Sequence, residues 1–203
     1  QITNPRVVYL NNDANLYRLK TDSAVFEISK SGYWGGITTE DGKITLRGEE
    51  FSSLPFRITL RNDRDQSSWA LSHFRAVKTE LRKNGSGWIF HSEYRNPEHT
   101  LTVFLTGKYD AGDAVAWNAS IVNNTGNTVS CFEFPILNGL QIGTPADDNL
   151  AWTGISAEPM TELPDWLRKT PGQLTWFDLY DKDFAFYTGV HDASMRDVIF
   201  NLT

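Results

Sequence analysis

Apolar and polar residues alternate along most of this chain, which is the pattern of β-strands with one buried face. The densest signal lies in the stretch 101–143, where residues 101–106, 115–121 and 129–134 each read as a strand. The turn cluster 123–127 is rich in Asn and Gly, which tolerate positive φ. Pro135 ends the third run because proline cannot donate a ladder hydrogen bond. These runs predict an antiparallel meander with a large apolar face.

The same pattern recurs elsewhere, with the strongest hairpin prediction around the dipeptide Asn84-Gly85. Two stretches lack it: the residues 32–36 interrupt a strand pattern, and 144–171 form a long irregular segment in which 163–168 could hold one helical turn. No segment keeps a 3.6-residue period. We therefore expect one all-β domain over 1–203, an antiparallel β-sandwich with very little helix. The further expected strands are 7–10, 16–20, 24–28, 44–46, 56–60, 73–83, 88–94, 174–180, 184–190 and 198–202.

The composition argues against two classes of binding partner. The net charge of −6 argues against nucleic acid, whose phosphates require a basic face, and against an anionic membrane surface. No apolar run approaches the roughly 20 residues that span a bilayer. The single cysteine, Cys131, lies in an expected strand and reads as a small buried hydrophobe.

No cofactor and no metal site is expected. The four histidines are scattered without zinc spacing. The pairs Asp147-Asp148 and Asp181-Lys182-Asp183 offer oxygens to calcium, but each lacks a full ligand set.

The last predicted strand runs to the end of the chain, as if the polypeptide continued. Export is expected from two other signals. The chain starts at Gln1 rather than Met, which fits a trimmed targeting segment. Asn84, Asn118, Asn123 and Asn201 each begin an Asn-x-Ser/Thr sequon. We therefore expect a secreted or periplasmic protein.

Several short motifs carry a family resemblance. The motifs are Trp117, Asn123 in a turn, Phe134-Pro135-Ile136-Leu137-Asn138-Gly139-Leu140, Pro171-Gly172-Gln173, Trp176-Phe177, Phe186-Tyr187-Thr188-Gly189 and His191-Asp192. With these motifs the chain resembles the galactose-mutarotase-like β-supersandwich domain that precedes the barrel in several large glycoside hydrolases, including the endo-α-N-acetylgalactosaminidase type. The similarity spans Ala24 to about Phe200.

The resemblance implies that catalysis and structural support belong to different domains. In such enzymes the following (β/α)₈ barrel carries the catalytic carboxylates, and no barrel is present in this chain. We therefore expect a non-catalytic N-terminal module that braces a missing C-terminal catalytic domain and contacts carbohydrate. The two alternatives are a free-standing carbohydrate-binding module and a small aldose-epimerase-type enzyme.

The residues by themselves favour no catalytic centre. An epimerase needs a histidine acid, for which His91, His99 and His191 are available, and a carboxylate base, for which Glu93, Glu133 and Glu158 are available. No pattern pairs one with another. Hydrolysis needs two facing carboxyl groups. The acids of the irregular segment that could supply them are Asp147, Asp148, Glu158, Glu162 and Asp165.

Tryptophans outside the clearly alternating segments are the strongest candidates for a ligand-binding site. Trp34, Trp69, Trp152 and Trp166 lie in such places. An indole ring combines an apolar face with a polar N–H and can stack on the C–H face of a sugar. They are the candidate carbohydrate-binding residues, and the alternative is that they pack in the core or against the missing barrel.

Overall fold

A computed structural model gives the structure of the protein and describes residues 15–40, 42, 45–47, 54–112, 114–137, 142, 146–152, 155–159 and 176–189. Every regular element in these ranges is a β-strand, and the strand pairs between described residues are antiparallel. The all-β antiparallel prediction is therefore confirmed. Over the same ranges, no helix has the length and apolarity needed to cross a membrane.

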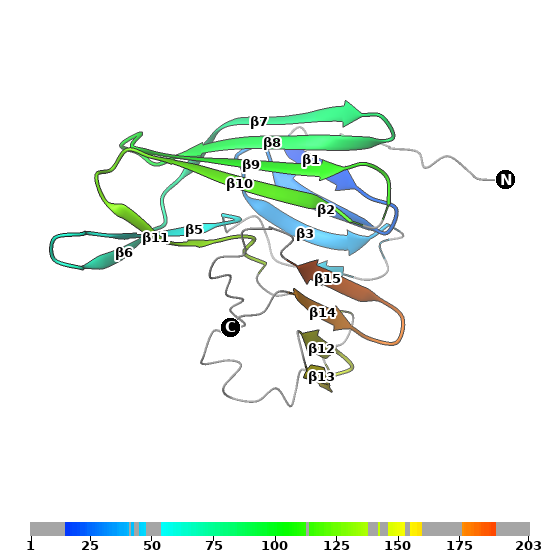
Figure 1. The fold of residues 1–203 in the computed structure, drawn as a ribbon. Coiled ribbons are helices and arrows are strands. Elements are labelled where there is room, and N and C mark those ends of the chain that lie inside the picture. Colours follow the sequence, from blue (N-terminus) through cyan, green and yellow to red (C-terminus); the bar gives the residue numbers. More distant parts are fainter. Residues whose placement is uncertain are drawn as a thin grey trace. The chain divides into compact units, whose positions relative to one another are not determined.

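Packing divides the chain into two compact units, one of 1–43 with 47–139 and one of 44–46 with 140–203. The expected single domain stays a prediction. The first unit contains a long four-stranded sheet in the order β10-β9-β8-β7 and a shorter sheet in the order β11-β5-β6 (Figure 1). It also contains β1, β2 and β3 of a second shorter sheet, whose full order is β1-β2-β3-β4. Its strands are β1 (Leu16–Lys20), β2 (Ala24–Ser29), β3 (Trp34–Thr39), β5 (Arg57–Arg61), β6 (Ser68–Leu71), β7 (Arg75–Asn84), β8 (Gly87–Arg95), β9 (Leu101–Tyr109), β10 (Ala116–Asn123) and β11 (Thr128–Glu133).

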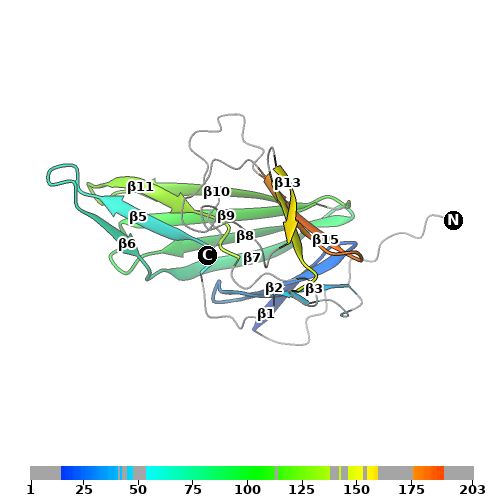
Figure 2. The same ribbon diagram turned by 90° about the horizontal axis from the view of Figure 1, so that it is seen from below.

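The first unit is a β-sandwich whose two shorter sheets pack on the same face of the long sheet. Seen from below, β1–β3 and β5-β6-β11 lie toward opposite ends of the long strands (Figure 2). Two apolar clusters fill the two contacts. One joins Ile58 and Leu60 of β5 to Val103 and Leu105 of β9, and the other joins Ile28 of β2 to the long sheet.

The inner face of β8 shows how alternation produces this packing. Trp88, Phe90 and Tyr94 point inward and are at most 1% exposed, as is Ser92, while Ile89, His91 and Glu93 between them are only partly buried. Each buried polar atom of these rings has a partner, since Trp88 Nε1 donates to the Lys20 carbonyl at 2.8 Å and Tyr94 Oη donates to the Gly32 carbonyl at 2.8 Å. Burial raises the pKa of Tyr94 above that of a free phenol, so its hydroxyl stays a donor.

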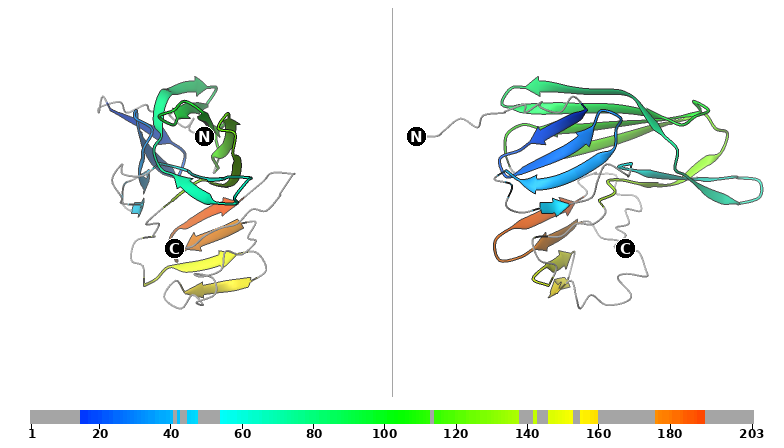
Figure 3. Two further views of the ribbon diagram at one scale, coloured as in Figure 1. Left: turned by 90° about the vertical axis from the view of Figure 1, so that its left-hand side faces the viewer. Right: turned by 180° about the vertical axis from the view of Figure 1, so that it is seen from behind.

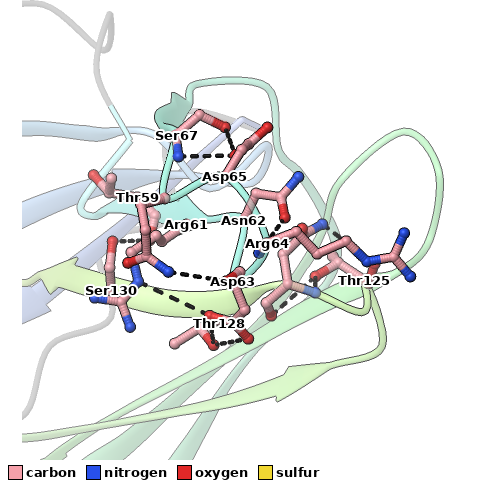
Figure 4. Close-up of polar contacts among 12 residues, drawn as sticks. Thr59, Arg61, Asn62, Asp63, Arg64, Asp65, Ser67, Thr125, Thr128 and Ser130 are labelled. Carbon is pink, nitrogen blue, oxygen red and sulfur yellow. Dashed lines mark hydrogen bonds and ion pairs between the residues drawn. The ribbon is translucent and has the colours of Figure 1, made fainter.

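Polar contacts tie the tip of the β5–β6 hairpin to β11 (Figure 4). Thr128 Oγ1 lies 2.9 and 2.8 Å from the two carboxylate oxygens of Asp63. Within the tip, residues 62–67, Asp65 Oδ1 accepts hydrogen bonds from the backbone N–H and the hydroxyl of Ser67, and these bonds lower the pKa of Asp65. Asp65 therefore acts as a local turn acceptor, whereas Asp63 joins the tip to β11.

The second unit contains a sheet in the order β13-β12-β14-β15 (Figure 3). Its strands are β12 (Asn149–Trp152), β13 (Ile155–Pro159), β14 (Trp176–Tyr180) and β15 (Ala185–Gly189), and the short strand β4 (Thr45–Arg47) overlaps its segment 44–46. Leu150, Phe177 and Leu179 are its buried apolar residues within the strands.

Some expectations about individual segments were wrong. Strand β3 includes three of the residues 32–36 expected to break the sheet, and β12 and β13 lie inside the segment 144–171 expected to be irregular. Strand β6 was also not expected. Short strands that pair with stronger neighbours need little alternation of their own, because cross-strand packing supplies their stability. The expected strands 7–10 and 198–202 and the helical turn 163–168 lie outside the described residues.

The burial expected for Cys131 was also wrong, since this residue is exposed. A register shift in β11 falls between Val129 and Cys131, so that Cys131 pairs with Thr59 rather than with a core-facing residue of β5. A bulge of this kind turns the following residue to the other face of the sheet, which alternation alone does not reveal.

Candidate functional site

The outer face of the long sheet β7–β10 is the candidate site. The two shorter sheets cover only its inner face, and no other described strand of the first unit covers the outer one (Figures 1 and 3). Antiparallel sheets commonly leave one face in water. This outer face, which we call the open face, carries the side chains that alternate with the core residues of β8 and β9.

Strand register sets the side chains of the open face in rows. Glu80, His91, Thr106 and Asn118 lie directly opposite one another across the four strands. Directly opposed residues of antiparallel strands have Cβ atoms roughly 4.5–5.5 Å apart and share one face. This central row therefore combines a carboxylate, an imidazole, a hydroxyl and an amide within reach of one small ligand.

The neighbouring row adds an aromatic ring. Lys78, Glu93, Phe104 and Ser120 lie opposite one another in register. The Phe104 ring stacks on the His91 ring with a centroid distance of 6.1 Å and an interplanar angle of 22°. The two rows together place a flat, partly apolar platform beside hydrogen-bonding groups.

A shallow depression of about 320 Å³ lies at the β7 side of this platform. Its lining consists of Lys78, Glu80, Arg82, Ile89, His91 and Thr106. The volume falls at the low end of the roughly 300–1,000 Å³ typical of small-molecule sites. The depression has room for one or two sugar rings and no deep enclosure, which suits binding better than catalysis.

Both acids of the open face are engaged in ion pairs. Glu80 accepts Lys78 Nζ at 2.9 Å and Arg82 Nη2 at 2.6 Å, and Glu93 accepts Arg95 Nη2 at 2.6 Å. The hydrogen bond from Lys78, followed by that from Arg82, lowers the pKa of Glu80. A general base works best with a pKa near the operating pH, so a lowered pKa makes Glu80 a poor one.

The ring of His91 is positioned by its neighbours. Its Nδ1 lies 3.1 Å from Thr106 Oγ1, and its face lies against Phe104. One ring nitrogen is thus engaged within the sheet, which leaves Nε2 as the nitrogen for a ligand. Sequence alternation already placed His91 and Glu93 on one face of a strand, but the partners on β7 and β9 depend on register and could not be predicted.

The four tryptophans expected to bind carbohydrate have different surroundings. Trp34 lies in β3 rather than in a loop, is 4% exposed, and packs on Trp117 with a centroid distance of 4.8 Å, so too little of its ring remains to stack on a sugar. Trp69 lies on the edge strand β6 and is 38% exposed, so its contact with a sugar stays a prediction. Trp152 lies in β12, and neither its side chain nor Trp166 falls among the described residues.

The candidate catalytic residues are scattered. His91 and Glu93 share the open face, whereas His99 lies in the turn between β8 and β9 and Glu133 lies 3.4 Å from Arg57 on another sheet. The side chain of Glu158 is not described, and His191, Glu162 and Asp165 lie outside the described residues. Among the described residues, His91 and Glu93 are therefore the only candidate histidine and candidate glutamate that share a face.

Acidic residues of the second unit lie close together. Asp148 is 3% exposed, its Oδ2 accepts the backbone N–H of Ile142 at 3.1 Å, and its Oδ1 has no hydrogen-bond partner. Burial raises the pKa of Asp148, and the charges of Asp181 and Asp147 raise it further. Within the described ranges, however, no three His, Cys, Asp or Glu side chains are grouped so that they could hold a metal ion.

The raised pKa of Asp148 predicts that Asp148→Asn stabilises the second unit at neutral pH. The folded state holds the proton more tightly than the unfolded state, so stability is full below the unfolded pKa and is lost as the pH rises through the folded pKa. The amide keeps an acceptor for Ile142 and removes the charge. Amide hydrogen exchange of β12 and β14 should be slower in the variant at pH 7 and nearly equal in the two proteins near pH 3. Faster exchange at pH 7 would show that the carboxylate is stabilising.

Comparison with known proteins assigns no family. No protein-family model, no curated protein and no solved structure matches this chain.

Proposed function

We propose that this chain is a non-catalytic β-sandwich module of a carbohydrate-active enzyme and that it contacts glycan through the open face of β7–β10. The observation that carries the proposal is the uncovered depression beside the stacked rings of His91 and Phe104. Sugars present both C–H faces and hydroxyl groups. A platform of flat rings bordered by carboxylate, hydroxyl and amide side chains matches both properties.

The finer parts of the proposal come from the resemblance. They are a galactose-mutarotase-like supersandwich, export to the periplasm or the medium, and a C-terminal glycoside hydrolase barrel that the module braces. The all-β antiparallel sandwich is compatible with each of them. A free-standing carbohydrate-binding module would use the same open face and would bind glycan without any barrel.

An epimerase is the weaker alternative because its acid and base would have to be His91 and a carboxylate of the same face. Glu80 and Glu93 are both engaged in ion pairs. The depression is also shallow, whereas proton transfer benefits from a site that excludes water. Binding needs neither a shifted pKa nor enclosure.

The proposal predicts that Phe104→Ala weakens glycan binding about two- to twelvefold, because an aromatic stacking contact contributes about 0.5–1.5 kcal/mol. His91→Ala should have a similar effect since it removes the second ring. Binding would be measured by screening a glycan array and then titrating the best oligosaccharide in a calorimeter. Trp69→Ala is the control, as this tryptophan lies on a different sheet. If Trp69→Ala abolishes binding and the open-face variants do not, the tryptophan interpretation is correct and the open face is not the site.

A further inference from the structure

The open face is basic although the chain as a whole is acidic. The residues of β7, β8 and β9 that lie on this face include five cationic side chains and two carboxylates, Glu80 and Glu93. A third carboxylate, Asp110, lies just past the end of β9 and forms an ion pair with Lys108. Five cations against three carboxylates leave a local net charge of +2, in a protein whose net charge is −6. The five cations are Arg75, Lys78, Arg82, Arg95 and Lys108.

Half of the excess positive charge lies at the depression. Glu80 alone is shared by Lys78 and Arg82, and all three side chains line the depression. One carboxylate cannot neutralise two cations, so this trio keeps a charge of +1. A ligand carboxylate placed beside Glu80 would restore equal numbers of positive and negative charges, with Arg82 able to bind it through two parallel hydrogen bonds.

Charge and shape together select a ligand class. We infer that the open face prefers saccharides that carry a carboxylate, such as uronic or sialic acids, with the carboxylate at Lys78 and Arg82 and the sugar ring toward His91. This inference rests on the proposed function, because it assigns the acidic group of a ligand whose ring uses the platform already described. A nucleic acid is the less favoured ligand, since the cations are confined to one small sheet face and are partly neutralised there.

Two matched pairs of probes test the inference with the full chain. The pairs are sialyllactose with lactose, and trigalacturonate with its fully methyl-esterified form, each titrated by calorimetry and by NMR. We expect at least one acidic probe to bind about ten- to hundredfold more tightly than its neutral counterpart, because only the acidic probe can form charge-assisted hydrogen bonds with Lys78 and Arg82. Lys78→Gln and Arg82→Gln should each remove most of that preference.

The control variant is Lys83→Gln. This residue lies on β7 opposite Trp88, so it faces the other side of the sheet while its loss changes the net charge equally. Equal affinity for both members of each pair, together with loss of binding in Phe104→Ala, would overturn the preference for acids and leave the proposed function standing. Binding of none of the four probes would overturn both. Tighter binding of a single-stranded oligonucleotide, with a steep dependence on salt, would overturn the saccharide in favour of nucleic acid.

Discussion

Replacing Trp88 with alanine lowers the free energy of unfolding of the first unit by about 3–5 kcal/mol, the cost typical of removing a large buried aromatic ring. Trp88 is 1% exposed and packs on Tyr109 with a centroid distance of 5.8 Å. Its loss would open a cavity between the long sheet and β1–β3. It would also leave the Lys20 carbonyl without its partner, since Trp88 Nε1 donates to it at 2.8 Å.

Trp69→Ala is the matched control for this prediction. Trp69 is 38% exposed on the edge strand β6, so its removal should cost far less. Urea unfolding followed by circular dichroism would give both values, because the backbone signal does not depend on the deleted indole. Equal losses for the two variants would contradict the placement of Trp88 in the core.

Gly87→Ala is expected to be nearly as disruptive. A Cβ atom at Gly87 would lie 1.7 Å from the Tyr109 carbonyl oxygen and 2.6 Å from its carbonyl carbon. These are backbone atoms of the neighbouring strand, so no side-chain rotation relieves the overlap and β8 must move away from β9. Overpacking typically costs about 1–3 kcal/mol, and we expect about 3 kcal/mol or more because the obstacle is backbone.

Ser86→Ala is the control for the glycine, since Ser86 is the exposed turn residue next to it. Its midpoint of urea unfolding should stay close to that of the unchanged protein. Amide hydrogen exchange would locate the damage of Gly87→Ala at the end of the β8–β9 ladder. Unchanged stability in Gly87→Ala would mean that the two strands do not approach as closely as described here.

The sequence predicted the strands whose own alternation is strong. The residues around Ile58 and Leu60, and the hairpin at Asn84-Gly85, needed only the period of two and the turn signal. The structure adds that Asn84 pairs with Gly87 and that Gly85 has φ 58°, as a two-residue hairpin turn requires. Such local signals do not depend on what the strand packs against.

Features that depend on pairing could not be predicted in this way. Trp34 lies within the glycine-rich stretch 32–36 and reads as a loop residue, yet it is buried because β3 pairs with β2 and the Trp34 ring packs on Trp117. The bulge that exposes Cys131 leaves no mark on the pattern. The residues of the open face could likewise not be predicted as a group. Alternation places His91 on the solvent-facing side of its strand, but only the register of the four strands brings Glu80, Thr106 and Asn118 beside it.

The most direct test of the account is an NMR titration of the isotope-labelled chain with the oligosaccharide that binds best on a glycan array. The largest chemical-shift changes are expected at His91, Phe104 and Thr106 and at the β7 residues that line the depression. Chemical-shift changes confined to Trp69 and its neighbours on β6, or to the second unit, would show that the open face of β7–β10 is not the ligand-binding site.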